Sequence, residues 1–317
     1  MCSAPQMVTL THEFPVLTYA QLADFLKKRD PASYYALVAL QKMKGEKLAP
    51  YVDDILRILN HNGHTDAWSQ YLARSEELRK LQATFEKTGR YPAGSYQEVR
   101  PIDDQRYKLA LLISFISTVH RFEILESLVE FLRLPCDAPK RLLSIGYGTG
   151  YELKIAYDHL PDWEIQAFDN SPTSFEYASA LLNHFNYPAT GLRQSLFPLE
   201  TKEGLENYQN KYGRILVCEL LEHLERPQDA LANLKSALHE DGLMYLTMAI
   251  NISQEDHVFL YTNQSQAREQ VLQCGFTIVK ELVSPVTVVP FTDRQREGVF
   301  RKGNYIAVVR RSSSRGS

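Results

Sequence analysis

The sequence lacks the features of a secreted, membrane-spanning or disulfide-rich protein. No apolar run approaches the ~18 residues needed to cross a bilayer, and the N-terminus lacks the basic-then-apolar order of a signal peptide. Only 4 of the 317 residues are cysteines, and they stand far apart with no CxxC pair. A disulfide framework or a thiolate zinc site is therefore not indicated. We expect a cytoplasmic protein with no membrane partner.

A strong charge of either sign is also missing. The formal net charge is −3, from 35 basic and 38 acidic residues, so no chain-wide field would attract nucleic acid. Only the C-terminal end concentrates Arg and Lys. At about 150 residues per domain, the length predicts two domains, or one large domain with an extension.

The chain divides into two parts with different periodicity. From about residue 18 to 134, apolar residues recur at helical spacing without a strand pattern. After Pro139, short apolar runs alternate with helical segments, which is typical of a doubly wound, mostly parallel sheet. The expected strands lie at 141–146, 164–169, 190–194, 214–218, 242–250, 275–282 and 304–310. We therefore predict an α/β fold in two domains. An all-helical N-terminal domain spans residues 1–138, and a domain with the doubly wound, mostly parallel seven-stranded sheet spans residues 139–317.

The first expected strand runs into a glycine loop, Gly146-Tyr147-Gly148-Thr149-Gly150. In a doubly wound sheet the ligand lies at the carboxyl ends of the strands, where glycines let the backbone approach it closely. The spacing differs from the dinucleotide fingerprint, because position 151 is Tyr where a small residue is needed. Asp169 ends the next strand, where its carboxylate can accept hydrogen bonds from ribose hydroxyls. A plain turn is the alternative at each position, but the two features on consecutive strands favour a nucleoside-containing ligand.

Four segments together resemble the class I S-adenosylmethionine-dependent methyltransferases over about residues 140–310. These segments are LLSIGYGTG, IQAFDNSP, RILVCELLEHLERPQDALANLKSALHEDGLMYLTMAI and QVLQCGFTIV. The resemblance implies a Rossmann-like fold, S-adenosylmethionine as cofactor, a glycine loop against its methionine part and an acid on its ribose. The cofactor-binding residues that it implies are Gly146, Gly148, Gly150, Asp169, Asn170 and Ser195. Ser144 and Ser195 depart from the family pattern, which usually has an acid before the loop and an Asp on the adenine amino group.

A second motif follows the fourth expected strand. Glu219, Glu222 and His223 are related by i, i+3 and i+4, so on a helix their side chains project from one face. His257, after the fifth strand, could supply a further ligand to a cation such as Mg²⁺, Mn²⁺, Fe²⁺ or Zn²⁺. The motif is similar to the ExxEH segment of ubiquinone-pathway O-methyltransferases and small-RNA 2′-O-methyltransferases, and this resemblance implies a divalent cation beside the acceptor hydroxyl.

Other interpretations of these residues remain open. Many methyltransferases carry a similar segment without a metal, and His223 or His257 would then be the candidate general base. His120 and Arg121 interrupt an apolar helical stretch, either to reach the acceptor or to pair within the helical domain. The Arg-rich segment 284–303 is either a lid or binding loop, or an ordinary solvated loop.

Taken together, these features predict a methyltransferase that acts on a small-molecule acceptor by O- or N-methylation. Secondary metabolism is one setting in which such a reaction occurs. The helical domain would form or cover the acceptor site. An RNA methyltransferase and a non-catalytic binding protein with this fold are the alternatives, although nucleic acid is not the expected partner. A homodimer is one option for the oligomeric state, which is left open, as is the identity of the acceptor.

Overall fold

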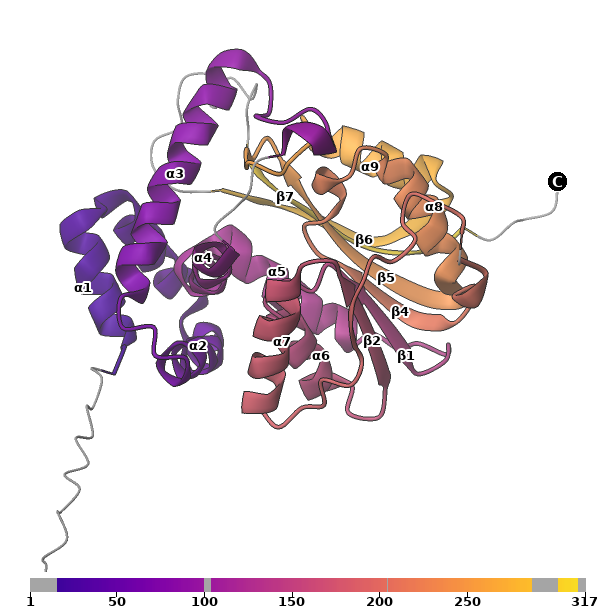
Figure 1. Ribbon diagram of the computed structural model, residues 1–317, viewed down its shortest axis with the longest axis horizontal. Helices are drawn as coiled ribbons and strands as arrows, with labels where there is room; N and C mark the ends of the chain where they lie inside the picture. Colours follow the sequence, from indigo (N-terminus) through magenta and orange to yellow (C-terminus); the bar gives the residue numbers. More distant parts are fainter. Residues whose placement is uncertain (1–15, 100–103, 204, 287–301, 313–317) are drawn as a thin grey trace, which may run out of the picture.

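The computed structural model describes residues 16–99, 104–203, 205–286 and 302–312. A helical N-terminal region lies beside a twisted sheet that carries helices on both faces (Figure 1). The N-terminal helices are α1 (Tyr19–Arg29), α2 (Pro31–His61), α3 (Ala67–Thr88), the short η1 (Tyr96–Glu98), α4 (Asp104–Ser117) and α5 (Val119–Leu132).

Local signals in the sequence place the ends of these helices. Thr18 begins α1 with a capping box, in which its hydroxyl accepts from the backbone of Gln21 while the Gln21 side chain accepts from the backbone of Thr18. Gly89 ends α3 in the left-handed conformation, with φ of 68°. The apolar stretch at 107–134 forms two helices, because Thr118 between them is extended, with φ of −135° and ψ of 140°.

The second half alternates strands and helices as the sequence predicts. Its elements are β1 (Arg141–Ile145), α6 (Tyr151–His159), β2 (Glu164–Asp169), α7 (Pro172–His184), β3 (Leu192–Gln194), η2 (Leu205–Asn207), β4 (Tyr212–Val217), η3 (Leu221–His223), α8 (Pro227–Ala237), β5 (Leu238–Ile250), α9 (Gln264–Gln273), β6 (Phe276–Pro285) and β7 (Gly303–Arg311). The strand order is β3-β2-β1-β4-β5-β7-β6, and β7 is antiparallel to both of its neighbours. The predicted fold class is therefore confirmed.

The central strands of the sheet are buried on both faces, and their residues alternate between two apolar cores. Leu142 and Leu216 belong to the core shared with α5, α6, α7 and the N-terminal helices, whereas Leu143 and Ile215 point into the core under α8 and α9. This alternation follows from the two-residue period of a strand. The predicted domain boundary at residue 138 falls between α5 and β1, and it stays a prediction, since the first core continues across it.

A buried arginine fixes α5 against the sheet. Arg214 of β4 is 2% exposed, and its Nη1 donates to the carbonyl oxygen of Phe131 at 2.5 Å. Its second terminal nitrogen donates to the carbonyl of Leu134, and its guanidinium lies over the rings of Phe131 and Trp163 at 4.8 and 5.2 Å. A cation at the C-terminus of a helix also complements the helix dipole. The start of α5 is thereby held toward the carboxyl ends of the strands.

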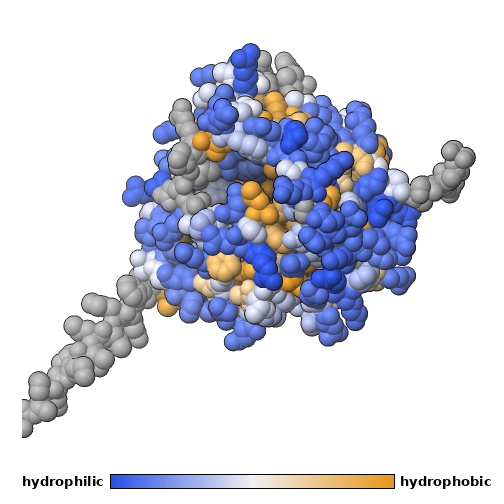
Figure 2. All heavy atoms as spheres, turned by 45° about the vertical axis from the view of Figure 1, so that its right-hand side comes forward, coloured by the Kyte–Doolittle hydropathy of each residue, from blue (hydrophilic) through white to orange (hydrophobic). Residues whose placement is uncertain are grey.

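The outer surface is mainly polar. Figure 2 shows one face covered by hydrophilic side chains, with apolar residues visible in smaller groups between them. None of the helices in the described residues has the length and apolar composition to span a lipid bilayer.

Candidate functional site

The glycine loop after β1 has a backbone that only glycine adopts easily. Gly146, Gly148 and Gly150 have φ of 69°, 48° and 78°, all in the left-handed region. Asp169 at the end of β2 holds the loop, because its two carboxylate oxygens accept from the backbone N–H groups of Gly148 and Ser171, each at 2.9 Å. The acid predicted to hold the ribose therefore also shapes the loop.

The three glycines face different surroundings. A Cβ on Gly150 would lie 2.7 Å from the Cβ of Ala178 and 3.0 Å from its Cα, so this glycine lets α6 and α7 pack closely. A Cβ on Gly148 would meet nothing within 4 Å. Open space beside Gly148, at the carboxyl end of β1, is what a ligand that contacts the loop requires.

The remaining predicted cofactor residues lie at the same edge of the sheet. Asn170 and Ser195 directly follow β2 and β3, and both are exposed. The sequence interpretation missed Leu196, which is 75% exposed although it is a large apolar residue. The signal that could have found Leu196 is its place beside Ser195, at a strand end where an apolar surface could receive an adenine ring. These residues fit S-adenosylmethionine.

A cluster of acid and histidine side chains forms at the carboxyl ends of β4 and β5. Ligand atoms of Glu222, His223 and His257 all lie within 4.8 Å of one another. The predicted helical spacing does not assemble them, because η3 is only a single short turn and His257 comes from the loop after β5. The convergence of these two segments brings the three side chains together.

Two atoms of this cluster are buried without a hydrogen-bond partner in the described residues. Glu222 is fully buried, and its Oε1 accepts from the backbone N–H of Ala249 at 3.1 Å while Oε2 has no partner. Nδ1 of His257 donates to the carbonyl oxygen of Ile252 at 2.8 Å, so the buried Nε2 keeps an unused lone pair. A carboxylate oxygen and a neutral imidazole nitrogen in this state are suited to bind a divalent cation.

The third member, His223, is oriented by an acid that the sequence interpretation missed. Nδ1 of His223 lies 3.1 Å from a carboxylate oxygen of Asp256 and also 3.1 Å from its carbonyl oxygen. Burial opposes protonation, but the charge and hydrogen bond of Asp256 outweigh it and raise the pKa of His223 to about 9. A carboxylate that accepts from Nδ1 is the arrangement that orients metal-binding histidines in proteins.

Burial and charge set the protonation of the other two members. Burial, with the negative charge of Glu219, raises the pKa of Glu222. Burial, with the positive charge of His223, lowers the pKa of His257 to about 3, so His257 is neutral at pH 7. Burial therefore disfavours the charged form of Glu222, and a bound cation would favour it.

Glu219 lies outside this cluster, contrary to its prediction as a ligand. Its backbone has φ of 50°, and both carboxylate oxygens accept from Nδ2 of Asn304 at 2.8 Å. Thr247 donates to Oε1 at 2.9 Å, and Arg121 pairs with Oε2 at 3.1 Å. Since four contacts already engage the carboxylate, Glu219 links α5, β5 and β7.

The helical region reaches the cluster through Tyr91. The ring of Tyr91 packs edge-on against the ring of His257, with centroids 5.5 Å apart. Its hydroxyl is buried and has no partner in the described residues. Sequence spacing carried no signal for Tyr91, because the residue follows the end of α3 in an irregular segment.

His120 and Arg121 take different positions near this edge. Arg121 is buried, pairs with Glu219 and lies over the ring of Phe115 at 4.7 Å. Nδ1 of His120 is buried without a partner in the part of the chain that the structure describes. Most of the Arg-rich segment 284–303 falls outside the described residues.

We expect His120 to make the fold sensitive to acid. Burial, with the positive charges of Arg121 and Lys302, lowers the pKa of His120 from 6.5 to about 3. The folded protein thus keeps its full stability above pH 6.5, and this contribution is lost as the pH falls toward 3, because the unfolded chain takes up the proton first. Between pH 7 and pH 5 the wild type should lose about 2 kcal/mol more free energy of unfolding than His120→Gln. Urea unfolding at both pH values measures this difference, and equally steep losses would contradict it.

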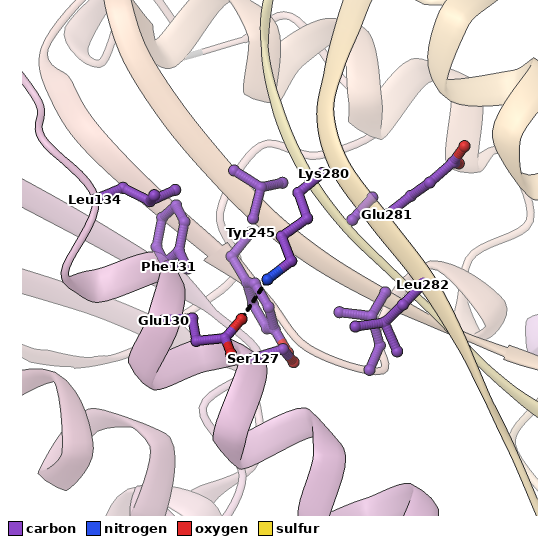
Figure 3. Close-up of a pocket in the computed structure, with 11 residues that line it drawn as sticks. Ser127, Glu130, Phe131, Leu134, Tyr245, Lys280, Glu281 and Leu282 are labelled. Atoms are coloured by element: carbon purple, nitrogen blue, oxygen red, sulfur yellow. Dashed lines mark hydrogen bonds and ion pairs between the residues drawn. The ribbon is translucent and has the colours of Figure 1, made fainter.

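A cavity elsewhere in the molecule is too small to hold the cofactor. It has a volume of about 40 Å³ and lies between α5 and the strands β5, β6 and β7, where Lys280 pairs with Glu130 (Figure 3). A volume of this size holds one or two water molecules. None of the predicted site residues lines it.

Comparison with known proteins identifies related sequences and folds. The family model described as "Methyltransferase domain" matches residues 118–279. A malonyl-[acyl-carrier protein] O-methyltransferase of Anoxybacillus flavithermus is 30% identical over 139 residues, which are 43% of this chain and 50% of that protein. The chain thus spans about half the length of this curated relative.

Solved structures with a similar arrangement include two of different activities. The [4+2]-cyclase SpnF superposes with a TM-score of 0.48 at 15% identity, covering 69% of this chain and 97% of that one. Phosphoethanolamine N-methyltransferase 2 of Haemonchus contortus superposes with a TM-score of 0.46 at 13% identity, covering 66% of this chain and 58% of that one.

Proposed function

Since the chain belongs to the class I S-adenosylmethionine-dependent methyltransferases, we propose that it methylates a hydroxyl or amine of a small molecule, with a divalent cation held by Glu222, His223 and His257. The observation that carries this proposal is the convergence of ligand atoms of these three residues within 4.8 Å, in a cluster where Oε2 of Glu222 and Nε2 of His257 are buried without partners in the described residues. Convergent buried ligand atoms without partners are costly to a fold unless they serve a bound group.

The cofactor brings its own reactive methyl group, so the protein contributes binding and alignment. We propose that the glycine loop receives the methionine part beside Gly148 and that Asp169 accepts from the ribose hydroxyls. Asn170, Ser195 and Leu196 would surround the adenine. In-line transfer then depends on how firmly the loop is held, and Asp169 holds it through the backbone of Gly148 and Ser171.

When bound, the cation would lower the pKa of an acceptor hydroxyl near the cofactor. This chain's residues supply its ligands, since Glu222 offers Oε2 and His257 offers the unprotonated Nε2. Asp256 fixes the ring of His223 through Nδ1, so Nε2 of that ring would bind the cation after releasing the proton that it keeps below its pKa of about 9. In a cation-free mechanism His223 or His257 would be the general base. With a pKa of about 9, His223 is already protonated at pH 7, and the burial that lowers the pKa of His257 to about 3 makes His257 a weak base.

The position of the helical region favours a small acceptor over a polymer. Tyr91 packs against His257, and this contact supports a role of the region 1–138 as the cover of the acceptor site. An acceptor must fit beneath this cover. The curated relative is named for an O-methyltransferase reaction on an acyl group carried by a protein, which supports oxygen as the acceptor atom. An RNA acceptor would instead require strongly salt-dependent binding, which a titration at two salt concentrations would reveal.

Methyl transfer before and after chelation tests the proposal. Turnover of S-adenosylmethionine with a panel of hydroxyl and amine acceptors should stop when the cation is removed, and Mg²⁺, Mn²⁺, Fe²⁺ or Zn²⁺ should restore it. Metal content is measured on the same samples. Turnover that persists in protein shown to be free of metal would contradict the role of the cation.

Replacing Asp169 by Ala should weaken cofactor binding by about 10- to 100-fold, because hydrogen bonds to a charged group are lost and the loop is released. Calorimetric titration with S-adenosylhomocysteine measures this affinity. Asp162→Ala is the matched control, since the Asp162 side chain is 80% exposed. Equal affinities of Asp169→Ala and the wild type would exclude the proposed role of Asp169.

A further inference from the structure

Helix α3 holds the loop that follows β5 at two points. The two terminal nitrogens of Arg74 donate to the two carboxylate oxygens of Glu255, each at 2.7 Å. About two turns further along the helix, the side-chain amide of Gln82 makes two hydrogen bonds to the loop. It donates to the carbonyl oxygen of Asn251 at 3.0 Å and accepts from the backbone N–H of Ser253 at 3.0 Å. These contacts join residues 169 to 181 positions apart in the sequence.

The contacts are buried and specific in geometry. The side chain of Arg74 is 4% exposed and that of Glu255 is 19% exposed, so water screens this ion pair poorly. A planar guanidinium that meets a carboxylate at two points fixes both side chains in orientation as well as distance. Gln82 is 9% exposed and pairs with both a backbone acceptor and a backbone donor, which fixes the main chain of the loop itself.

The loop held in this way carries one of the three members of the cation cluster, His257, and the acid that orients a second member. Glu255 is followed directly by Asp256, which orients His223, and by His257, which offers Nε2. On its other side the loop rests on η3, because the backbone N–H of Val258 donates to the carbonyl oxygen of Glu222 at 2.9 Å. The loop thus lies between α3 and η3.

Asn251 marks the point where this loop departs from β5. Its backbone has φ of 54°, in the left-handed region that non-glycine residues rarely adopt. Such a conformation persists only where surrounding contacts impose it. Gln82 binds the carbonyl oxygen of Asn251, so α3 supplies one of those contacts.

We propose that Arg74 and Gln82 are positioning residues of the cation site, and that the site is complete only while α3 is docked on this loop. The inference rests on the proposed function, in which Glu222, His223 and His257 bind the cation. Because binding energies are reciprocal, a bound cation in turn strengthens the docking of the helical region. The N-terminal region thereby takes part in the chemistry of the site as well as covering it.

Mn²⁺ titration of the full chain, without cofactor or acceptor, tests this inference. Arg74→Met keeps the length and apolar contacts of the side chain but removes both hydrogen bonds to Glu255. We expect a 10- to 100-fold loss of Mn²⁺ affinity, the size typical of a lost partner to a metal ligand. The Mn²⁺ affinity of Arg74→Lys should lie between those of the wild type and Arg74→Met, since an ammonium cannot bind the carboxylate at two points in one plane.

Arg79→Met is the matched control. Arg79 belongs to the same helix and also forms an ion pair, with Asp30 at 2.7 Å, but this contact stays within the helical region. We expect Mn²⁺ affinity to be unchanged in this variant. Equal losses in Arg74→Met and Arg79→Met would show a general effect on the helical region and would overturn the positioning role.

A second substitution keeps the test decisive if Arg74→Met fails to fold. Gln82→Met removes the other contact with the loop and should also weaken Mn²⁺ binding, with circular dichroism confirming the fold. Wild-type Mn²⁺ affinity in either folded variant overturns the inference. Glu222→Gln distinguishes a failure of the proposed cation site from a failure of the positioning role. If Glu222→Gln leaves Mn²⁺ binding unchanged, the proposed cation site is wrong. If Mn²⁺ binding is lost in Glu222→Gln but kept in the Arg74 and Gln82 variants, only the positioning role is wrong.

Discussion

Replacing Glu222 by Gln is expected to abolish cation binding and to lower kcat/KM by about 1,000-fold or more, while the fold becomes as stable as before or more so. Gln keeps the size of the side chain and the acceptor for the backbone N–H of Ala249, but it removes a fully buried carboxyl group whose charged form burial disfavours. A buried carboxyl whose pKa is raised costs the metal-free fold stability at neutral pH, so its replacement by a neutral amide should not destabilise that form. A loss of about 1,000-fold corresponds to about 4 kcal/mol of transition-state stabilisation.

Three measurements on one preparation check this expectation. Metal analysis gives the occupancy, transfer of a labelled methyl group gives kcat/KM, and thermal unfolding after chelation gives the stability. Glu206→Gln serves as the control, since Glu206 lies exposed in η2. A Glu222→Gln enzyme with wild-type turnover and metal content would refute the cation site.

Two glycine substitutions in one loop are expected to fail in different ways. In Gly150→Ala the new Cβ would lie 2.7 Å from the Cβ of Ala178, so α7 must shift and the free energy of unfolding should fall by about 2–4 kcal/mol. In Gly148→Ala the new methyl group meets open space, so only the strain of φ near 48° is added, about 1 kcal/mol. That methyl group, however, occupies the space proposed for the cofactor, and S-adenosylhomocysteine should bind at least 10-fold more weakly.

Gly89→Ala is the control that separates the effect of backbone strain from the effect of a methyl group in the proposed cofactor site. Gly89 ends α3 with φ of 68° and also has nothing within 4 Å of an added Cβ, so it matches Gly148 in strain and in space. Denaturant unfolding of the three variants gives their stabilities, and calorimetry gives their affinities for S-adenosylhomocysteine. Weak binding in Gly89→Ala, or full binding in Gly148→Ala, would argue against a cofactor beside Gly148.

The sequence predicted the sheet correctly because each strand carries its own signal. Strands buried on both faces need nearly continuous apolar runs, and the loops between them need turn residues. The same holds for the glycine loop, whose three left-handed residues tolerate only glycine without strain. Asp169 at the next strand end completes a pattern that parallel strands place at one edge.

The acid and histidine cluster was predicted less completely, because its geometry arises outside a regular helix. Spacing by i, i+3 and i+4 placed Glu219 with Glu222 and His223, but the chain turns at Glu219 with φ of 50° and η3 is only a short turn. Glu219 is instead drawn into contacts with Arg121 and Asn304, which are 98 and 85 positions away in the sequence. A spacing rule contains no information about such partners.

The sequence by itself determined the two-part architecture, the sheet and the chemistry available at its edge, since these depend on periodicity and on residues within a few positions of one another. Only the tertiary structure decided which acids and histidines meet. It brought Asp256 to His223, the ring of Tyr91 to that of His257, and Arg74 to Glu255, 181 positions away. The physical reason is that contacts between distant segments follow from the packing of whole elements, which no local pattern records.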